Sequence, residues 1–197
     1  MDYTTTADVF SYGDVQVPSV NQTAVMNKIV TAVSRRVDKI CSMNFAQHTF
    51  TNKLTAVRVT LDGVLTLYAN SPTITSVSTV NLRAGNTPAL LPVNIENIDI
   101  QEYGYGSKLS LYGFDYMQFR ELRTFKAYMT YTGGWATLAE VPEEFQLAVT
   151  RLVWFTYQQR AAPMQATAVP ELGVITLPAS IQPDIMDVLK RYAWWWS

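Results

Sequence analysis

Residues 131–160 read YTGGWATLAEVPEEFQLAVTRLVWFTYQQR, and this stretch decides the fold because a strand pattern ends in it and a helix pattern begins. The pair Gly133-Gly134 predicts a turn. Pro142 suits the first position of a helix, and Glu143 and Glu144 favour the positive end of the helix dipole. We therefore interpret the two glutamates as helix-start residues and not as a catalytic pair.

The helix that follows is apolar almost all round. One stripe along it consists of Phe145, Ala148, Val149, Leu152, Val153 and Thr156. Leu147, Trp154 and Phe155 lie off this stripe. A helix with apolar side chains on several faces must be covered on several sides.

Upstream of this block, residues 54–131 carry the pattern of β-strands. Apolar residues recur there with a period of two, between clusters of turn-forming residues. Asp62-Gly63 separates two such runs and predicts a hairpin, because both central positions of the turn need positive φ. The segment from Gly85 to Gly106, with Pro88 and Pro92, predicts a long loop or a ragged hairpin.

The N-terminal part predicts helices. Thr5 to Phe10 predicts a short helix that ends near Gly13. Ser19 and Gln22 form a capping-box pattern in front of an apolar stripe, which predicts a helix of about five turns. The stripe consists of Val25, Ile29, Val33, Val37 and Ile40. The opposite face carries Lys28, Arg35, Arg36 and Lys39, and it is either a solvated face or a surface for a partner.

The C-terminal part predicts an arm, a helix and an aromatic tail. Residues 161–178 are rich in Ala, Pro and Thr without a clear period, which indicates an extended arm. Pro183 predicts the start of a last helix, with Ile185, Val188, Leu189 and Tyr192 on one face. Trp194, Trp195 and Trp196 cannot all face one core from one helical turn, so we expect at least one to be exposed in an isolated subunit.

These patterns predict an α+β fold. We expect a helical core of a long N-terminal helix, a central apolar helix and a C-terminal helix, with a long antiparallel β insertion between the first two. The 197 residues, 48% of them hydrophobic, suffice for one domain. Its parts are residues 1–50 (N-terminal helical part), 51–132 (β insertion), 133–160 (core helix), 161–180 (arm) and 181–197 (C-terminal helix and Trp tail).

Composition limits the classes of partner. The chain has 15 basic and 16 acidic residues, and only 16% of its residues are charged, against about 25% in an average soluble protein. Binding to polyanions is therefore not supported. Few charges together with 12% aromatic residues fit a surface that is buried against other subunits, while a Thr- and Ser-rich β domain explains them equally well. No stretch approaches the roughly 20 apolar residues of a membrane span, and no signal-peptide pattern is present.

The sequence offers little material for catalysis. His48 is the only histidine and lies between two aromatic residues, and Cys41 is the only cysteine and lies beside the apolar stripe of a helix. A lone cysteine excludes an internal disulfide and a cysteine-based zinc site. No nucleotide-binding, HExxH or EF-hand pattern occurs. We therefore expect no enzyme activity, no cofactor and no metal.

Basic and aromatic residues alternate once, between Phe119 and Lys126. The cations there are Arg120, Arg123 and Lys126. They fit a strand with solvated charges, or a positively lined passage for DNA.

The block Tyr131-Thr132-Gly133-Gly134-Trp135, with Val141-Pro142 and the helix to Arg160, resembles the signature end of the head-tail connector (adaptor) family of tailed bacteriophages. Three further blocks fit that family in the same order. They are Thr5 to Val9 before a helix that ends near Cys41 and Phe45, the β segment with Asp62-Gly63 and residues 70–77, and the helix from Ile181 to Tyr192. The β insertion between Asn81 and Arg123 is longer than the minimal family version, and the three tryptophans are not part of the pattern.

The resemblance implies a structural virion protein made in the host cytoplasm and located in the neck. Such proteins form a ring of about a dozen copies beneath the portal protein, by heterologous contacts around one axis. The ring extends the channel through which packaged DNA passes, and it offers a platform for the stopper or tail protein.

Three groups of residues are candidates for contacts in such a ring. For docking to the portal or a neighbour they are Trp194, Trp195, Trp196, Lys190 and Arg191. For contacts between subunits they are Trp154, Phe155, Met164, Val169, Leu172, Val174 and Ile175. For lining the DNA channel they are Arg120, Arg123 and Lys126.

Two other functions compete with the connector. A head-completion stopper or tail-end protein of the same particle would also be small and ring-forming, but stoppers are usually more wholly β. A carbohydrate- or ligand-binding β module could use Tyr103, Tyr105, Tyr112 and Tyr116 as a platform, although the same tyrosines fit a half-buried sheet.

Overall fold

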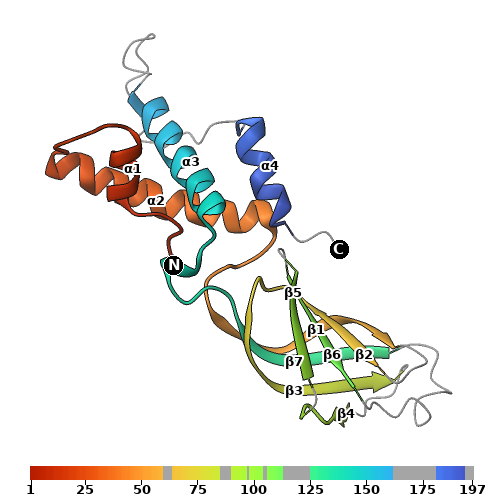
Figure 1. Cartoon of the computed structure of the whole chain (residues 1–197). Helices are drawn as coiled ribbons and strands as arrows, with labels where there is room; N and C mark the ends of the chain where they lie inside the picture. Colours follow the sequence, from red (N-terminus) through yellow and green to blue (C-terminus); the bar gives the residue numbers. More distant parts are fainter. Residues whose placement is uncertain are drawn as a thin grey trace, which may run out of the picture. The chain divides into compact units, whose positions relative to one another are not determined.

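The computed structural model describes residues 1–59, 64–84, 90–96, 98–103, 106–112, 125–161 and 181–193. The chain divides into two compact units (Figure 1). The helical unit contains residues 1–42 and 137–193, and the β unit contains residues 43–136.

The helical unit holds four α-helices in the described part of the chain. They are α1 (Thr6–Tyr12), α2 (Val20–Cys41), α3 (Glu143–Ala161) and α4 (Pro183–Arg191), with a 3-10 turn, η2 (Leu138–Glu140), before α3. The capping box predicted at Ser19 is confirmed: Gln22 N–H donates to Ser19 Oγ (3.2 Å), and Ser19 N–H donates to Gln22 Oε1 (2.8 Å). Thr5 and Asp8 form a second capping box, which starts α1.

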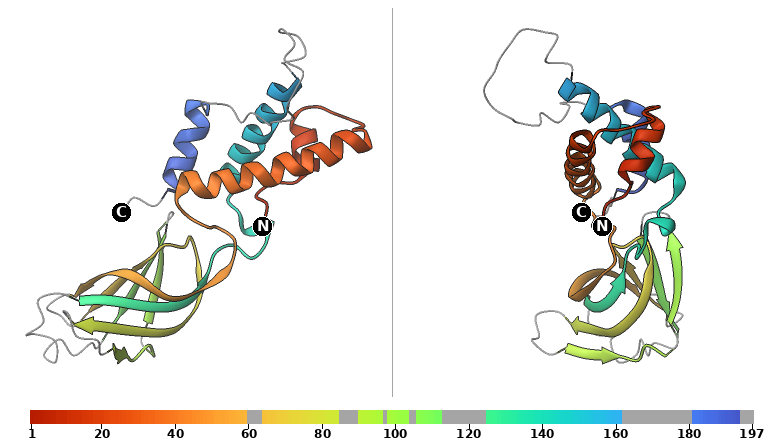
Figure 2. Two further views of the ribbon diagram at one scale, coloured as in Figure 1. Left: turned by 180° about the vertical axis from the view of Figure 1, so that it is seen from behind. Right: turned by 90° about the vertical axis from the view of Figure 1, so that its left-hand side faces the viewer.

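The helices form two layers, with α2 in one and α1, α3 and α4 in the other (Figure 2). The six residues of the predicted α3 stripe are buried. Neighbours on three sides, α1, α2 and α4, explain why α3 carries apolar residues around most of its circumference. Tyr3 closes one end of this core, where its N–H donates to Ser34 Oγ (3.2 Å) and its hydroxyl donates to Asp38.

The β unit is one antiparallel sheet with the strand order β4-β3-β7-β1-β2-β6-β5. Its strands are β1 (His48–Val59), β2 (Leu65–Ala69), β3 (Ile74–Ala84), β4 (Leu90–Val93), β5 (Ile98–Tyr103), β6 (Gly106–Leu111) and β7 (Phe125–Gly133). Side chains on the concave face make the core, among them Leu67, Leu82, Leu109, Met129 and Tyr131. The period of two predicted this alternation of buried and exposed residues.

The loop predicted between Gly85 and Gly106 is wrong in part, because this segment contains β4 and β5. Proline was the misleading signal. Pro92 lies in β4, an edge strand, where a residue without an N–H group is tolerated. The hairpin alternative fits better, since β5 pairs with β6 up to Tyr103 and Gly106. The Asp62-Gly63 turn lies outside the described residues, but β1 and β2 on either side of it pair antiparallel from Val59 and Leu65.

The Gly-Gly-Trp corner, residues 133–135, ties together the chain segments at one end of the β unit. Trp135 N–H donates to Phe45 O (2.7 Å), Gln47 N–H donates to Trp135 O (2.9 Å), and Gly134 N–H donates to Thr73 O (2.9 Å). The rings of Phe45 and Trp135 stack, with centroids 5.0 Å apart. The corner thus joins the segment by which the chain enters the β unit to the segment by which it leaves. The α+β class predicted from the sequence is confirmed.

Candidate interaction surfaces

The outer face of α2, which points away from the other helices of its unit, carries a stripe of cations. The stripe consists of three exposed side chains, Lys28, Arg35 and Lys39. Arg35 lies two turns after Lys28, and Lys39 lies one turn after Arg35. The small residues Ala24, Thr31 and Ala32 lie on the same face, and Thr31 Oγ1 donates to Asp2 Oδ2 (3.0 Å). The carboxylate of Asp38 lies at the margin of the stripe and pairs with Arg35 (3.3 Å).

The opposite layer is held together by ion pairs between α3 and α4. Arg151 Nη1 lies 2.6 Å from Asp184 Oδ2, and Arg191 Nη1 lies 3.2 Å from Glu144 Oε2. The hydroxyl of Tyr192 also donates to Glu144 Oε1 (2.7 Å). The hydrogen bond from Arg151 lowers the pKa of Asp184. These pairs could not be predicted from the sequence, because the two partners of each pair lie more than thirty residues apart.

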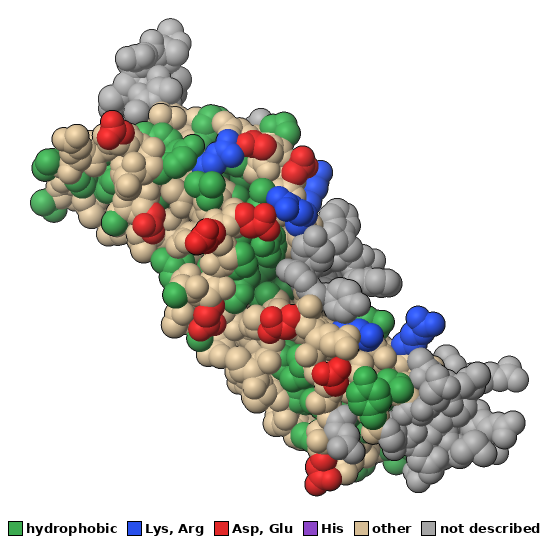
Figure 3. Space-filling view, viewed as in Figure 1, with side chains coloured by type: hydrophobic (Ala, Val, Ile, Leu, Met, Phe, Trp, Pro, Cys, Tyr) green, Lys and Arg blue, Asp and Glu red, His purple; other side chains and the backbone are tan. Residues whose placement is uncertain are grey.

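Carboxylates remain exposed on this layer. Asp8 of α1, Glu143 of α3 and Asp187 of α4 point to solvent, and in the described part of the chain neither Glu143 nor Asp187 has an ion-pair partner. Acidic side chains are prominent on the helical part of the face in Figure 3. Two large apolar side chains accompany them: Leu147 is 51% exposed and Tyr12 is 48% exposed.

The predicted intersubunit residues of α3 are partly used within the subunit. Trp154 packs over Gly13, where an added Cβ would lie 2.3 Å from the indole ring, and its ring stacks on Tyr157 at 5.7 Å. Both Trp154 and Phe155 are half-buried. Met164, Val169, Leu172, Val174 and Ile175 lie outside the described residues, so their contact between subunits remains a prediction.

The predicted docking residues also lie partly within and partly outside the described residues. Lys190 and Arg191 are exposed on the last turn of α4. Trp194, Trp195 and Trp196 lie outside the described residues. Arg191 is paired with Glu144, so it also stabilises the subunit.

Lys126 lies on the convex face of the sheet. It is the cross-strand partner of Arg83 on β3, so both side chains stand on the same face, and Arg58 of β1 is exposed as well. Arg120 and Arg123 lie outside the described residues. Strands β1, β3 and β7 contain no acidic residue, which makes this part of the convex face basic.

The two candidate catalytic side chains have structural partners. Cys41 is fully buried, and its Sγ donates to Leu189 O (3.5 Å). His48 Nδ1 lies 2.9 Å from Ala46 O, and its ring packs on Phe50 with centroids 3.7 Å apart. Within the described ranges, no three His, Cys, Asp or Glu side chains group in a way that could hold a metal ion. No helix among the described residues combines the length and apolar character of a membrane span.

We predict that Cys41 resists alkylation in the folded chain. Burial, and next the charge of Asp38, raise the pKa of its thiol from 9.0 to about 12. The reactive thiolate is then about a thousandfold scarcer at pH 8 than for an ordinary cysteine. Iodoacetamide labelling followed by mass spectrometry should be at least about 100-fold slower in buffer than in guanidinium chloride. Equal rates would contradict the burial, and no other cysteine can confuse the readout.

The described architecture has counterparts among solved structures. One is a chain in the neck of an empty gene transfer agent (GTA) particle, computed with C6 symmetry. It aligns with a TM-score of 0.50 at 11% sequence identity, over 95% of this chain and 87% of its own. The two chains share a fold.

Two further matches come from the same kind of particle. A chain in the neck of a native GTA particle, computed with C12 symmetry, aligns at 11% identity with a TM-score of 0.44, over 86% of this chain and 82% of its own. A chain in the virion of a native GTA particle aligns at 11% identity with a TM-score of 0.46, over 88% of this chain and 79% of its own. No protein-family model and no curated protein matches the sequence.

Proposed function

We propose that this chain is a structural head-to-tail connector of a phage-like particle, which assembles as a ring beneath the portal. The observation that carries the proposal is the fold it shares, over 95% of its length, with a chain in the neck of a GTA particle. That neck was computed with C6 symmetry, which fits a closed ring of repeated contacts. The motif resemblance to head-tail connectors supports the same location.

In this proposal, about a dozen copies extend the DNA channel and offer a platform for the stopper or tail protein. A stopper would be more wholly β, whereas here the helices α1, α2, α3 and α4 make up a unit of their own. The chain works by binding and not by catalysis: Cys41 and His48 both contact groups of their own unit. Of the four tyrosines of the alternative carbohydrate module, Tyr112 is exposed, and the side chains of the other three lie outside the described part, so that platform stays a prediction.

The tryptophan tail is the proposed anchor to the portal or to a neighbouring subunit. It follows α4, which Tyr192 and Arg191 fix to Glu144 of α3. A tail that leaves from a fixed point loses less conformational freedom on docking than a tail on a mobile segment. Large rigid aromatic side chains are effective anchors in a partner pocket. The arm, with Trp154 and Phe155 of α3, would embrace the adjacent subunit.

The basic convex face of the β unit is the proposed lining for DNA. Lys126 and Arg83 stand side by side there, and Arg120 and Arg123 would extend the same charge. Cations spread over a surface attract phosphates without reading sequence. This suits a passage through which all of the DNA must slide.

Electron microscopy of particles that carry this chain tests the proposal. We expect a ring of its copies beneath the portal, with the C-terminal tryptophans against the portal or the neighbouring subunit. Density for this chain in the shell, in fibres or at the far end of a tail would overturn the connector role. Particles that lack the chain serve as the control, and they should keep DNA-filled heads without attached tails.

A further inference from the structure

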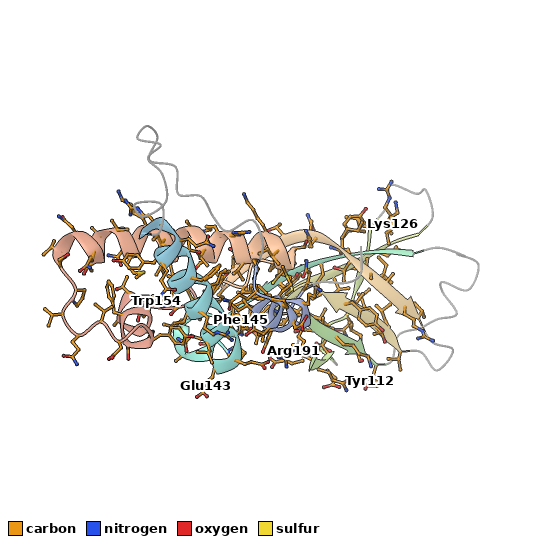
Figure 4. The ribbon with its side chains drawn as sticks, turned by 90° about the horizontal axis from the view of Figure 1, so that it is seen from above. Tyr112, Lys126, Glu143, Phe145, Trp154 and Arg191 are labelled. Carbon is orange, nitrogen blue, oxygen red and sulfur yellow. The ribbon has the colours of Figure 1, made fainter. Side chains whose placement is uncertain are left out.

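The helical unit has opposite charge on its two layers. The outer face of α2 presents Lys28, Arg35 and Lys39, whereas the layer of α1, α3 and α4 presents Asp8, Glu143 and Asp187. Figure 4 shows Glu143 on the side of the unit opposite to the nitrogen-tipped side chains of α2. Helices α1, α3 and α4 together carry five acidic and four basic residues, whereas α2 carries four basic residues and one acidic residue. Two of the four cations of the second layer, Arg151 and Arg191, are paired with Asp184 and Glu144. The other two, Arg160 and Lys190, are exposed near the C-terminal ends of α3 and α4.

The shapes of the two faces also complement each other. Beside its cations, the α2 face carries the small side chains Ala24, Thr31 and Ala32, with Asp2 bound to Thr31 at the margin. The other layer exposes two large apolar side chains: Leu147, 51% exposed and one turn after Glu143 on α3, and Tyr12, 48% exposed at the end of α1. A ridge of large side chains packs into a groove lined by small ones, which is the usual way in which helices associate.

We infer that these two faces bind each other between neighbouring copies of the chain: the cationic α2 face of one copy docks on the acidic α1, α3 and α4 face of the next. The inference rests on the proposed ring and adds to it the surfaces that build the ring. A closed ring needs a heterologous contact, in which each subunit offers two different and complementary surfaces. Two like-charged faces could not pair in a two-fold dimer, so the charge separation favours a head-to-tail arrangement.

Charge reversal with mutual rescue tests this contact. One variant carries Lys28→Glu, Arg35→Glu and Lys39→Glu, so both of its faces are negative. A second variant carries Asp8→Lys, Glu143→Lys and Asp187→Lys, so both of its faces are positive. Each variant alone should repel itself, whereas an equimolar mixture should assemble in alternation, because every contact then again joins opposite charges.

The measurement is sedimentation velocity of the full chain, at low salt and over concentrations up to about 1 mM. We expect the unaltered chain to associate, with an association constant that falls at least about tenfold when the ionic strength rises from 0.05 to about 0.5 M. Each reversed variant should lose at least about tenfold in self-association, and the mixture should recover most of it. All six positions are exposed, but Asp8→Lys removes the capping box of α1 and Arg35→Glu removes the ion pair with Asp38. Each of these contacts contributes about 1 kcal/mol, so circular dichroism should show that both variants keep the fold.

A matched control reverses three exposed cations of the β unit, Lys53→Glu, Arg58→Glu and Lys126→Glu. It changes the net charge as much as the α2 variant does, yet it should leave self-association within about twofold of the unaltered chain. The inference is overturned if the unaltered chain stays monomeric, if the mixture fails to rescue, or if α2 binds duplex DNA without self-association.

The outcomes keep the two proposals apart. If particles show a ring in the neck but the reversed variants still assemble into it, the ring stands and this interface is wrong. If the charges govern self-association but no ring lies in the neck, the interface stands and the connector role is wrong.

Discussion

Replacing Gly134 by alanine is expected to lower the free energy of unfolding of the β unit by about 3 kcal/mol. Gly134 has a φ of +104°, a conformation that L-residues with a side chain rarely adopt. An added Cβ would lie 2.7 Å from Ala46 O and 2.8 Å from Phe45 O. Both contacts are with backbone, which cannot turn away as a flexible side chain would.

The backbone of Phe45 and Ala46 cannot move away from the added methyl group without losing contacts of its own. Phe45 O accepts a hydrogen bond from Trp135 N–H at 2.7 Å, and the Phe45 ring stacks on the Trp135 ring. Any shift that makes space for the methyl group must therefore weaken the contacts that close the corner. A loss of about 3 kcal/mol is a large part of the 5 to 15 kcal/mol that stabilises an ordinary domain.

Hydrogen exchange measured by mass spectrometry checks this prediction, because it reports each unit separately. Protection should fall by about two powers of ten in residues 43–136, as 1.4 kcal/mol corresponds to a factor of ten. Ala136→Ser is the matched control: it also adds one heavy atom, at an exposed position, and should change stability by less than about 0.5 kcal/mol. Equal protection in Gly134→Ala and the unaltered chain would show that the corner is not a rigid element.

The contacts of Gly134 show which features of the structure could be predicted from the sequence and which could not. The pair Gly133-Gly134 predicted a turn, because the conformation of a turn depends mainly on the types of the residues in it. The partners of that turn, Phe45 and Ala46, lie almost ninety residues away and follow from the pairing of β1 with β7. The same holds for Trp154 over Gly13, where the missing side chain of one residue makes room for an indole far along the chain.

Helices and their faces were predictable for the same local reason. The capping box at Ser19 and the apolar spacing fixed α2, and Ile29, Val33 and Val37 are buried as expected. Val25 and Ile40, at the two ends of the predicted stripe, are only half-buried, while Met26 and Val30 are fully buried. The buried face of α2 is therefore rotated slightly relative to the predicted one. The spacing of apolar residues at every third or fourth position indicates a face but does not determine its centre.

The candidate interaction surfaces were predictable only as residue types. The cations of α2 were visible in the sequence, and a solvated face explained them as well as a partner surface did. What the sequence could not provide is the opposite layer, because Glu143 and Asp187 come from helices whose packing depends on the whole unit. Glu143 was interpreted as a helix-start residue, and its place in the first turn of α3 agrees with that role. The charge of the surface around it appears only when α1, α3 and α4 are assembled.

The second large effect is expected for Phe145→Ala in the helical unit. Phe145 is fully buried, and its ring forms T-shaped pairs with two tyrosine rings: Tyr3 at 5.6 Å and Tyr192 at 5.0 Å between centroids. One side chain thus links the N-terminal segment, α3 and the end of α4. Removal of a buried phenylalanine costs about 3 to 5 kcal/mol, and each lost aromatic pair adds about 0.5 to 1.5 kcal/mol.

The loss should be greatest where α4 attaches. Without Phe145, the ring of Tyr192 loses the aromatic ring against which it packs, although the hydrogen bond of its hydroxyl to Glu144 can remain. We expect hydrogen exchange in residues 181–193 to rise by two powers of ten or more, and protease cleavage in this segment to accelerate with it.

Leu147→Ala is the matched control on the same helix: Leu147 is 51% exposed, so its removal should cost less than about 0.5 kcal/mol. Similar effects of the two substitutions would mean that α3 does not present Phe145 to α4. If α4 alone exchanges faster while the other helices keep their protection, then Phe145 is the contact that holds the base of the tryptophan tail in place.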